Sequence, residues 1–134
     1  MKKNKASSTA YTVVHGVLHV AKNTKFSSLV KSEIIEACEK ILLASNDGKR
    51  RICELNSPIK SKILPFLEWL LLPGAALNYV LRKKFIEEKV LEAIDNGIAQ
   101  IVNIGAGFDT IAYRLSKKFP NINFIEIDHP ATSR

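Results

Sequence analysis

Residues 99–128 constrain the fold more than any other part of the chain, because two apolar runs there are joined by a glycine turn and a helical pattern. The run Gln100–Ile104 favours a β-strand, and the run Asn123–Ile127 favours a second one. Between them, residues 109–118 have the spacing of an amphipathic helix. Strand, turn, helix and strand make one βαβ unit, whose right-handed crossover brings the carboxyl ends of both strands to one edge of a parallel sheet. Open α/β sheets bind their ligands at that edge.

The residues at this edge have the chemistry of a nucleotide-cofactor pocket. Gly105 and Gly107 lack a Cβ, so the turn can adopt positive φ and a ligand can approach the backbone closely. The helix that follows directs its unpaired N–H groups and the positive end of its dipole to the same place. Asp128 lies 23 residues beyond Gly105, where a carboxylate can accept hydrogen bonds from ribose hydroxyls. A strand-to-helix turn that binds no ligand is the alternative, and Asp128 makes it the weaker one.

The sixth position of the glycine motif separates two classes of adenosine cofactor. Dinucleotide-binding folds have G-x-G-x-x-G, in which the last glycine lets the helix pack closely against the strand. Here that position is Thr110, which argues against NAD and FAD. A sulfonium cofactor has no pyrophosphate and needs only the first two glycines and the ribose carboxylate. The sequence therefore favours a cofactor of the S-adenosyl-L-methionine type.

Ahead of the βαβ unit the pattern is helical. Apolar residues recur with helical spacing and predict four helices. These span Tyr11–Ala21, Ser27 or Ser28 to about Ala44, Pro58 to the residues before Pro73, and Ala75–Asp95. Turn residues at 45–48 are expected to end the second helix, and the basic, polar segment Lys49–Ser57 is predicted to be a loop.

Charge, hydropathy and cysteine usage exclude several functional classes. The formal charge of +7 arises in residues 1–62, which hold 12 Lys and Arg against 5 Asp and Glu, but no aromatic residues are interleaved with them as in base-stacking surfaces. Nucleic-acid binding is therefore not expected. The most apolar stretch, 63–73, contains Glu68 and is shorter than the roughly 20 residues of a membrane span. Cys38 and Cys53 form no C-x-x-C pair and no disulfide framework, which favours the reducing cytoplasm.

Three motifs bear a resemblance to a known family. They are Val102-Asn-Ile-Gly-Ala-Gly-Phe-Asp-Thr110, Ala112-Tyr-Arg-Leu115 and Phe124-Ile-Glu-Ile-Asp-His-Pro130. Together they resemble the leucine carboxyl methyltransferase family, which includes the polyketide-type O-methyltransferases. The resemblance implies a class I S-adenosyl-L-methionine-dependent methyltransferase. The expected fold is α/β, with a helical N-terminal cap over residues 1–98 and, over 99–134, the start of a Rossmann-like cofactor-binding domain, truncated after its first βαβ unit.

Carried over position by position, the resemblance implies a set of cofactor-binding residues. They are Arg82, Gly105, Ala106, Gly107, Asp109 and Asp128. The glycine turn would line the methionine and ribose part of the cofactor, and Asp128 would bind the ribose hydroxyls. Asp109 would shape the turn or contact the cofactor's amino group. Arg82, on the last cap helix, would pair with the cofactor's carboxylate, for which a planar bidentate donor is well suited.

Arg82 also has a second interpretation. The neighbouring Lys83 and Lys84 precede Glu87 and Glu88 by four residues, a spacing typical of ion pairs on a solvated helix face. Arg82 itself has an isoleucine four residues later and so lacks such a partner. A cofactor role and a place on that solvated face therefore both stay open for Arg82.

The histidines favour packing over metal binding. His15 and His19 lie four residues apart and can share a helix face, but no third ligand is suggested nearby and no H-E-x-x-H motif is present. No metal site is expected. Tyr11 and His15 can instead lie near the mouth of the site, because N-terminal helices cover the substrate in the family. Cys38, on an apolar helix face, is expected to be a small core residue.

The expected reaction is an in-line transfer of a methyl group to a carboxylate or hydroxyl oxygen, which depends above all on positioning. The acceptor is a small-molecule or carboxylate-bearing substrate, and no catalytic residue is assigned. Because the pattern stops after two strands, we expect an N-terminal portion of an enzyme that binds cofactor weakly, is inactive alone and self-associates through uncovered apolar surface. The alternative is a non-catalytic helical interaction module that retains a cofactor-like glycine turn.

Overall fold

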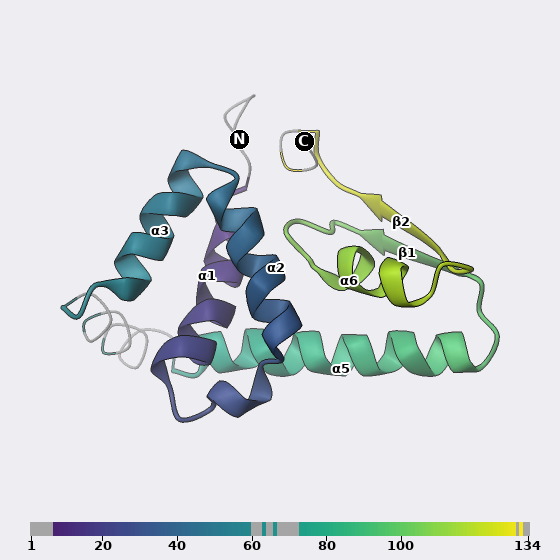
Figure 1. Ribbon diagram of the computed structural model, residues 1–134, viewed down its shortest axis with the longest axis horizontal. Helices are drawn as coiled ribbons and strands as arrows, with labels where there is room; N and C mark the ends of the chain where they lie inside the picture. The colour runs from purple at the N-terminus through teal and green to yellow at the C-terminus, as the bar shows by residue number, and fades with distance from the viewer. Residues whose placement is uncertain (1–6, 60–62, 64–65, 67–72, 131, 133–134) are drawn as a thin grey trace.

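The computed structural model describes residues 7–59, 63, 66, 73–130 and 132, and these have a mixed α/β architecture that is mostly helical (Figure 1). The helices are α1 (Ser8–Asn23), the 3₁₀ helix η1 (Ser27–Leu29), α2 (Ser32–Leu43), α3 (Asn46–Asn56), α5 (Ala75–Asp95) and α6 (Ile111–Lys118). The strands are β1 (Gln100–Ile104) and β2 (Asn123–Ile127). Figure 1 shows α1, α2 and α3 grouped over one end of α5, with β1, α6 and β2 beside the rest of its length.

The core lies among the cap helices, where apolar side chains of α1, α2, α3 and α5 pack together. Its buried members are Tyr11, Val14, Val17, Leu18, Val20, Val30, Cys38, Leu42, Leu55, Ala76 and Val80. Cys38 is thus a core residue, as predicted, and burial raises the pKa of its thiol to about 11. Both cysteines are free thiols, and Cys53 is exposed.

The prediction of a loop at Lys49–Ser57 is wrong, because most of this segment belongs to α3. The Oγ of Ser45 accepts a hydrogen bond from the N–H of Gly48 at 3.0 Å and so caps the helix. Leu55, on the inner face of α3, is buried in the core. The turn residues expected to end one helix therefore begin the next one.

The predicted helix from Ser27 or Ser28 to Ala44 is interrupted. Val30 lies between η1 and α2 with an extended backbone, at φ −108° and ψ 114°. Its β-branched side chain is buried in the core in this conformation, and such residues favour extended over helical backbone. Helical spacing on both sides of Val30 is therefore not enough to make one continuous helix.

The other predicted elements follow the sequence pattern. The helix Ala75–Asp95 is confirmed as α5 with the same bounds, and Tyr11–Ala21 lies inside the longer α1. The helix predicted from Pro58 to the residues before Pro73 falls mostly outside the described residues. The predicted βαβ unit is confirmed: β1 and β2 pair in parallel, with Ile104 opposite Ile127. Helix α6 begins at Ile111, two residues later than predicted, because the preceding residues belong to the turn.

A buried ion network joins the cap to the βαβ unit. Glu87 of α5 pairs with Arg114 of α6, and only 7% and 5% of their side chains are exposed. The Oε1 of Glu87 also accepts a hydrogen bond from Lys31 at 3.0 Å. Burial alone would raise the pKa of Glu87, but the hydrogen bonds from Arg114 and Lys31 outweigh it and hold this pKa below its ordinary value of 4.5. The interpretation of Glu87 as a residue of a solvated helix face is therefore wrong.

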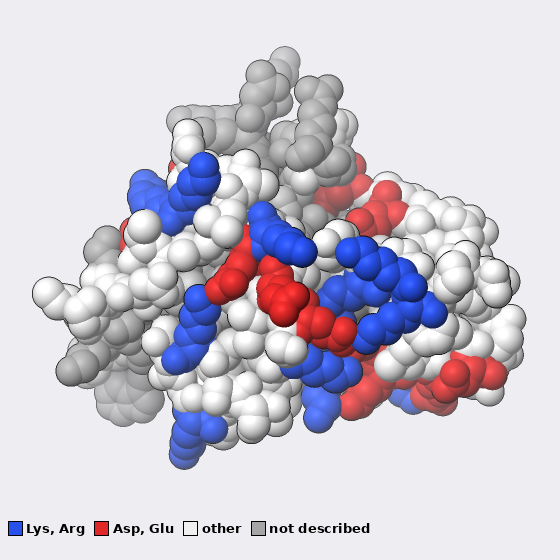
Figure 2. Space-filling model, viewed as in Figure 1, with Lys and Arg blue, Asp and Glu red and all other residues white. Residues whose placement is uncertain are grey.

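The network continues to the surface. Arg114 Nη1 lies 3.5 Å from Glu33 Oε1, and Glu33 in turn pairs with Lys118 at 2.7 Å. Figure 2 shows Lys and Arg side chains interspersed with Asp and Glu side chains on the face of the molecule that is seen in Figure 1. None of the helices within the described residues is long and apolar enough to span a bilayer.

Candidate functional site

The glycine turn leads from β1 into α6. Gly105 and Gly107 both have positive φ, at 70° and 59°, which residues with a Cβ rarely adopt. The N–H of Gly105 donates to the Ile127 carbonyl at 2.7 Å, and the N–H of Asp109 donates to the Ala106 carbonyl at 2.9 Å. A Cβ at Gly105 would meet no atom within 4 Å, so open space lies directly against the backbone here.

Asp128 follows β2 and reaches the same turn. Its Oδ2 accepts a hydrogen bond from the N–H of Gly107, and its Oδ1 accepts one from the N–H of His129 at 2.5 Å. An ionised carboxylate has about four acceptor positions. Asp128 therefore retains capacity for further donors at this edge of the sheet.

Asp109 connects the turn to α5. Its Oδ1 accepts a hydrogen bond from the N–H of Ile111 at 2.8 Å, and its Oδ2 accepts one from Lys83 Nζ at 2.5 Å. Only 17% of the Asp109 side chain and 16% of the Lys83 side chain are exposed. Both carboxylate oxygens of Asp109 thus have partners within the protein.

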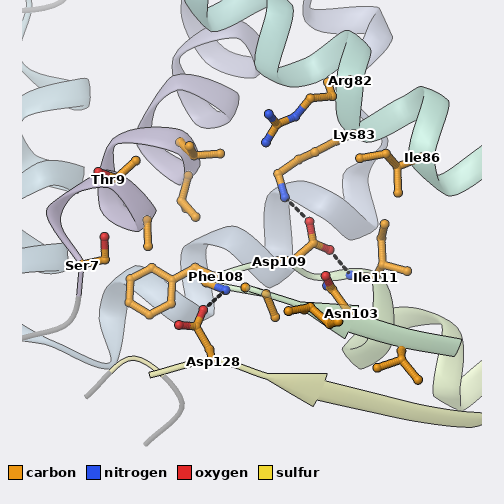
Figure 3. Close-up of a pocket in the computed structure, with 18 of the residues that line it drawn as sticks. Ser7, Thr9, Arg82, Lys83, Ile86, Asn103, Phe108, Asp109, Ile111 and Asp128 are labelled. Carbon is orange, nitrogen blue, oxygen red and sulfur yellow. Dashed lines mark hydrogen bonds and ion pairs between the residues drawn. The ribbon is translucent and has the colours of Figure 1, made fainter. Parts of the chain in front are cut away.

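These residues line an open cavity of about 560 Å³ that lies between α1, α5 and the carboxyl ends of the strands (Figure 3). This volume lies within the range of small-molecule sites. All the predicted site residues line it, namely Arg82, Gly105, Ala106, Gly107, Asp109 and Asp128. Residues that are up to 46 positions apart in the sequence, 82 to 128, therefore meet around one space.

The N-terminal part of α1 covers the turn. The ring of Phe108 packs edge-on against Tyr11, with centroids 4.8 Å apart and planes at 75°. The Tyr11 hydroxyl lies 2.7 Å from Ser45 Oγ, which connects this contact to the cap of α3. Tyr11 therefore contacts Phe108, a lining residue of the cavity, but neither Tyr11 nor His15 is among the described residues that line the cavity itself.

The histidines lie within the cap. His19 is buried, and the pKa of His15 is lowered by burial and then by the nearby charges of Arg51 and His19. No group of three or more His, Cys, Asp or Glu residues in the described ranges is arranged to hold a metal ion.

Thr110 occupies the position of the third glycine in dinucleotide folds. It is buried, and its Oγ1 accepts a hydrogen bond from Arg114 Nε at 3.1 Å. A hydrogen-bonded side chain thus fills the place that a glycine leaves open for close packing of helix and strand.

Sequence reasoning missed several residues of the cavity. They are chiefly Lys83, Asn103, Ser7 and Thr9. Asn103 gave a usable signal, because it is a polar residue between two apolar residues of the strand. Lys83 gave none, since its spacing from Glu87 equals that of an ordinary helix ion pair. Ser7 and Thr9 reach the cavity only because α1 packs across α5, which no local pattern encodes.

Comparison with known proteins bears on this site. The leucine carboxyl methyltransferase family matches residues 20–134, which include α5, the glycine turn and Asp128. A protein of Mycobacterium marinum named "Putative S-adenosyl-L-methionine-dependent methyltransferase" is 48% identical over 50 residues, which make up 37% of this chain and 15% of that protein. No solved structure gives a significant match. Since the family match covers most of the chain, from the end of α1 through the glycine turn to residue 134, the chain belongs to the leucine carboxyl methyltransferase family.

Proposed function

We propose that this chain provides the cap and the cofactor half-site of an S-adenosyl-L-methionine-dependent methyltransferase that transfers a methyl group to a carboxylate or hydroxyl oxygen. The observation that supports this most is the convergence of all the motif residues on one cavity, from α5, the glycine turn and the end of β2. A turn that served only to join a strand to a helix would not require an arginine of α5 and a carboxylate after β2 at the same space.

The cavity suits the parts of this cofactor. Open space at Gly105 admits a ligand against the backbone, and Asp128 retains acceptor capacity for ribose hydroxyls. Arg82 offers a planar guanidinium for a carboxylate. When bound, the cofactor supplies an electrophilic methyl group on a sulfonium. Phe108 and Tyr11 pack edge-on beside the turn.

The role of the chain in the reaction is to hold the donor in place, because an in-line displacement gains most from orientation. A carboxylate acceptor needs no general base, whereas a hydroxyl acceptor does. The two carboxylates of the cavity, Asp109 and Asp128, already accept hydrogen bonds from the protein. We therefore assign Asp109 to shaping the turn and Asp128 to ribose binding. Neither residue is assigned the role of general base.

The non-catalytic interaction module is not favoured as an alternative. The family match extends from residue 20 through the glycine turn to residue 134, so cap and turn are matched together. A helical module that retained the turn by chance would not need to preserve both parts.

Titration of the ¹⁵N-labelled chain with S-adenosyl-L-homocysteine, followed by NMR, tests the proposal and detects even millimolar affinity. We expect saturable shifts of the amides of Gly105, Gly107 and Ile111, and no comparable response to NAD. Absence of saturable shifts at the turn would refute the proposed function.

A pair of glycine variants distinguishes the effect of filling the cavity on ligand affinity from the effect of backbone strain. Gly105→Ala places a methyl group in open space of the cavity, whereas Gly97→Ala introduces a methyl group at a similarly positive φ, 88°, beyond the end of α5. Both strain the backbone by about 1–2 kcal/mol, but only Gly105→Ala is expected to weaken ligand affinity. Equal affinities of the two variants would contradict the assignment of the cavity.

A further inference from the structure

We propose that Lys83 is a positioning residue of the cofactor site: by pairing with Asp109 it fixes the glycine turn and leaves Arg82 as the cation that meets the ligand's carboxylate. The inference rests on the proposed function and gives a role to a residue that lies outside the family motifs. It also gives different roles to two adjacent cations of α5.

The contacts of Asp109 show how Lys83 acts on the turn. One carboxylate oxygen holds the N–H of Ile111 at the start of α6, and the other holds Lys83 Nζ. The N–H of the same residue closes the turn onto the Ala106 carbonyl at 2.9 Å. Gly107, whose N–H donates to Asp128, lies between Ala106 and Asp109 in this turn. The turn is therefore held from α5 as well as from the strands.

Loss of the lysine amine would leave a mostly buried carboxylate without a cation. Such a group moves towards water or attracts another cation. Arg82, the preceding residue of α5, is the other cation that lines the described part of the cavity. Each of these responses either moves the turn or withdraws the guanidinium from the ligand.

The charges around the cavity are consistent with separate roles for Lys83 and Arg82. Its described lining contains two cations, Arg82 and Lys83, and two carboxylates, Asp109 and Asp128. Figure 3 shows Lys83 directed at Asp109, whereas Arg82 has no hydrogen bond or ion pair to the residues drawn. A ligand with one carboxylate and a pair of hydroxyls thus meets one uncommitted guanidinium and one carboxylate with acceptor capacity.

Affinity for S-adenosyl-L-homocysteine, measured by NMR titration, tests the inference in a matched set of variants. The set is Lys83→Met, Lys83→Arg, Asp109→Asn, the double variant Lys83→Met with Asp109→Asn, and Lys84→Met as the control. Lys83→Met is expected to weaken affinity about tenfold, within the coupling range of residues in contact. Lys83→Arg retains a cation and should stay within about threefold of the wild type.

The double variant distinguishes positioning from simple packing. It removes both charges, while the amide at position 109 still offers an acceptor to the N–H of Ile111. We therefore expect the double variant to recover most of the affinity lost in Lys83→Met. The exposed Lys84 lies outside the cavity lining, so Lys84→Met should bind like the wild type.

Amide hydrogen exchange of the ligand-free chain provides a second readout. Exchange at Gly107 and Ile111 should be about tenfold faster in Lys83→Met and unchanged in Lys84→Met. If the wild type binds and Lys83→Met binds equally well, the positioning role is overturned, whatever the exchange rates. If the wild type shows no ligand response, the proposed function fails, and unchanged exchange in Lys83→Met would then overturn the anchoring of the turn as well.

Discussion

Replacement of Arg114 by methionine should destabilise the chain through the buried partner that it leaves behind. Arg114 donates to Glu87 and, through Nε, to Thr110 at 3.1 Å. Methionine preserves much of the side-chain volume and removes every one of these donors. Among the described residues, Glu87 would then keep the ion pair with Lys31, whose side chain is 59% exposed.

The expected loss in the free energy of unfolding follows from the burial of the Arg114–Glu87 pair. Breaking a buried ion pair by removing one partner costs about 3–5 kcal/mol. With 5% and 7% of the two side chains exposed, solvent screening reduces this little. Because Lys31 remains at 3.0 Å from Glu87, we expect the lower end, about 3 kcal/mol. For a chain of this length, that corresponds to a fall in Tm of roughly 10 °C.

Urea and thermal unfolding followed by circular dichroism measure this effect. Lys118→Met removes the exposed end of the same network, where Lys118 and Glu33 side chains are 51% and 33% exposed, and should cost less than about 1 kcal/mol. Combining Arg114→Met with Glu87→Leu should restore most of the stability, since apolar replacement of a buried pair is often neutral. A loss below about 1 kcal/mol in Arg114→Met, or equal losses in Arg114→Met and Lys118→Met, would refute the reasoning.

Three further predictions concern titratable groups. Iodoacetamide at pH 8 should alkylate the exposed Cys53 much faster than Cys38, whose pKa of about 11 and burial suppress its thiolate; equal labelling by mass spectrometry would contradict this. The lowered pKa of Glu87 contributes stability above its unfolded value of 4.5 that is lost as pH falls through the folded value, so Glu87→Gln should flatten the acid limb of a stability–pH curve. The pKa of His15, lowered from 6.5, makes the unfolded state bind protons more readily, so stability should fall below about pH 6.5 and His15→Gln should reduce that fall in urea titrations.

The βαβ unit was predictable because its determinants are local. Two short β-rich runs, a pair of glycines and an amphipathic helix specify strand, turn and helix without reference to the rest of the chain. The cap was less predictable for the opposite reason. The backbone at Val30 is extended as its side chain packs into the core, and Ser45 begins α3 where its turn chemistry suggested an end.

The site shows the same contrast between local and distant determinants. Gly105, Gly107 and Asp128 could be placed from spacing, since parallel strands bring their carboxyl ends together. The residues that α5 contributes could not be placed from spacing. Adjacent residues of a helix point about 100° apart, and only packing decides which of them meets the turn. Lys83 contacts Asp109 for this reason, although its spacing from Glu87 suggested an ordinary surface pair.

Two ion pairs of opposite polarity connect α5 to α6 and to the turn before it, so the conformation of the turn depends on the cap. Lys83 of α5 contacts Asp109 ahead of α6, and Glu87, four residues further along α5, contacts Arg114 within α6. Residues four apart lie on one face of a helix, so both pairs act along the same side of α5. Two contacts at separate points fix the rotation of α6 as well as its distance from α5. Because the glycine turn is continuous with the start of α6, its shape is set by α5 as much as by the strands, and the proposed cofactor half-site and the cap form one structural unit.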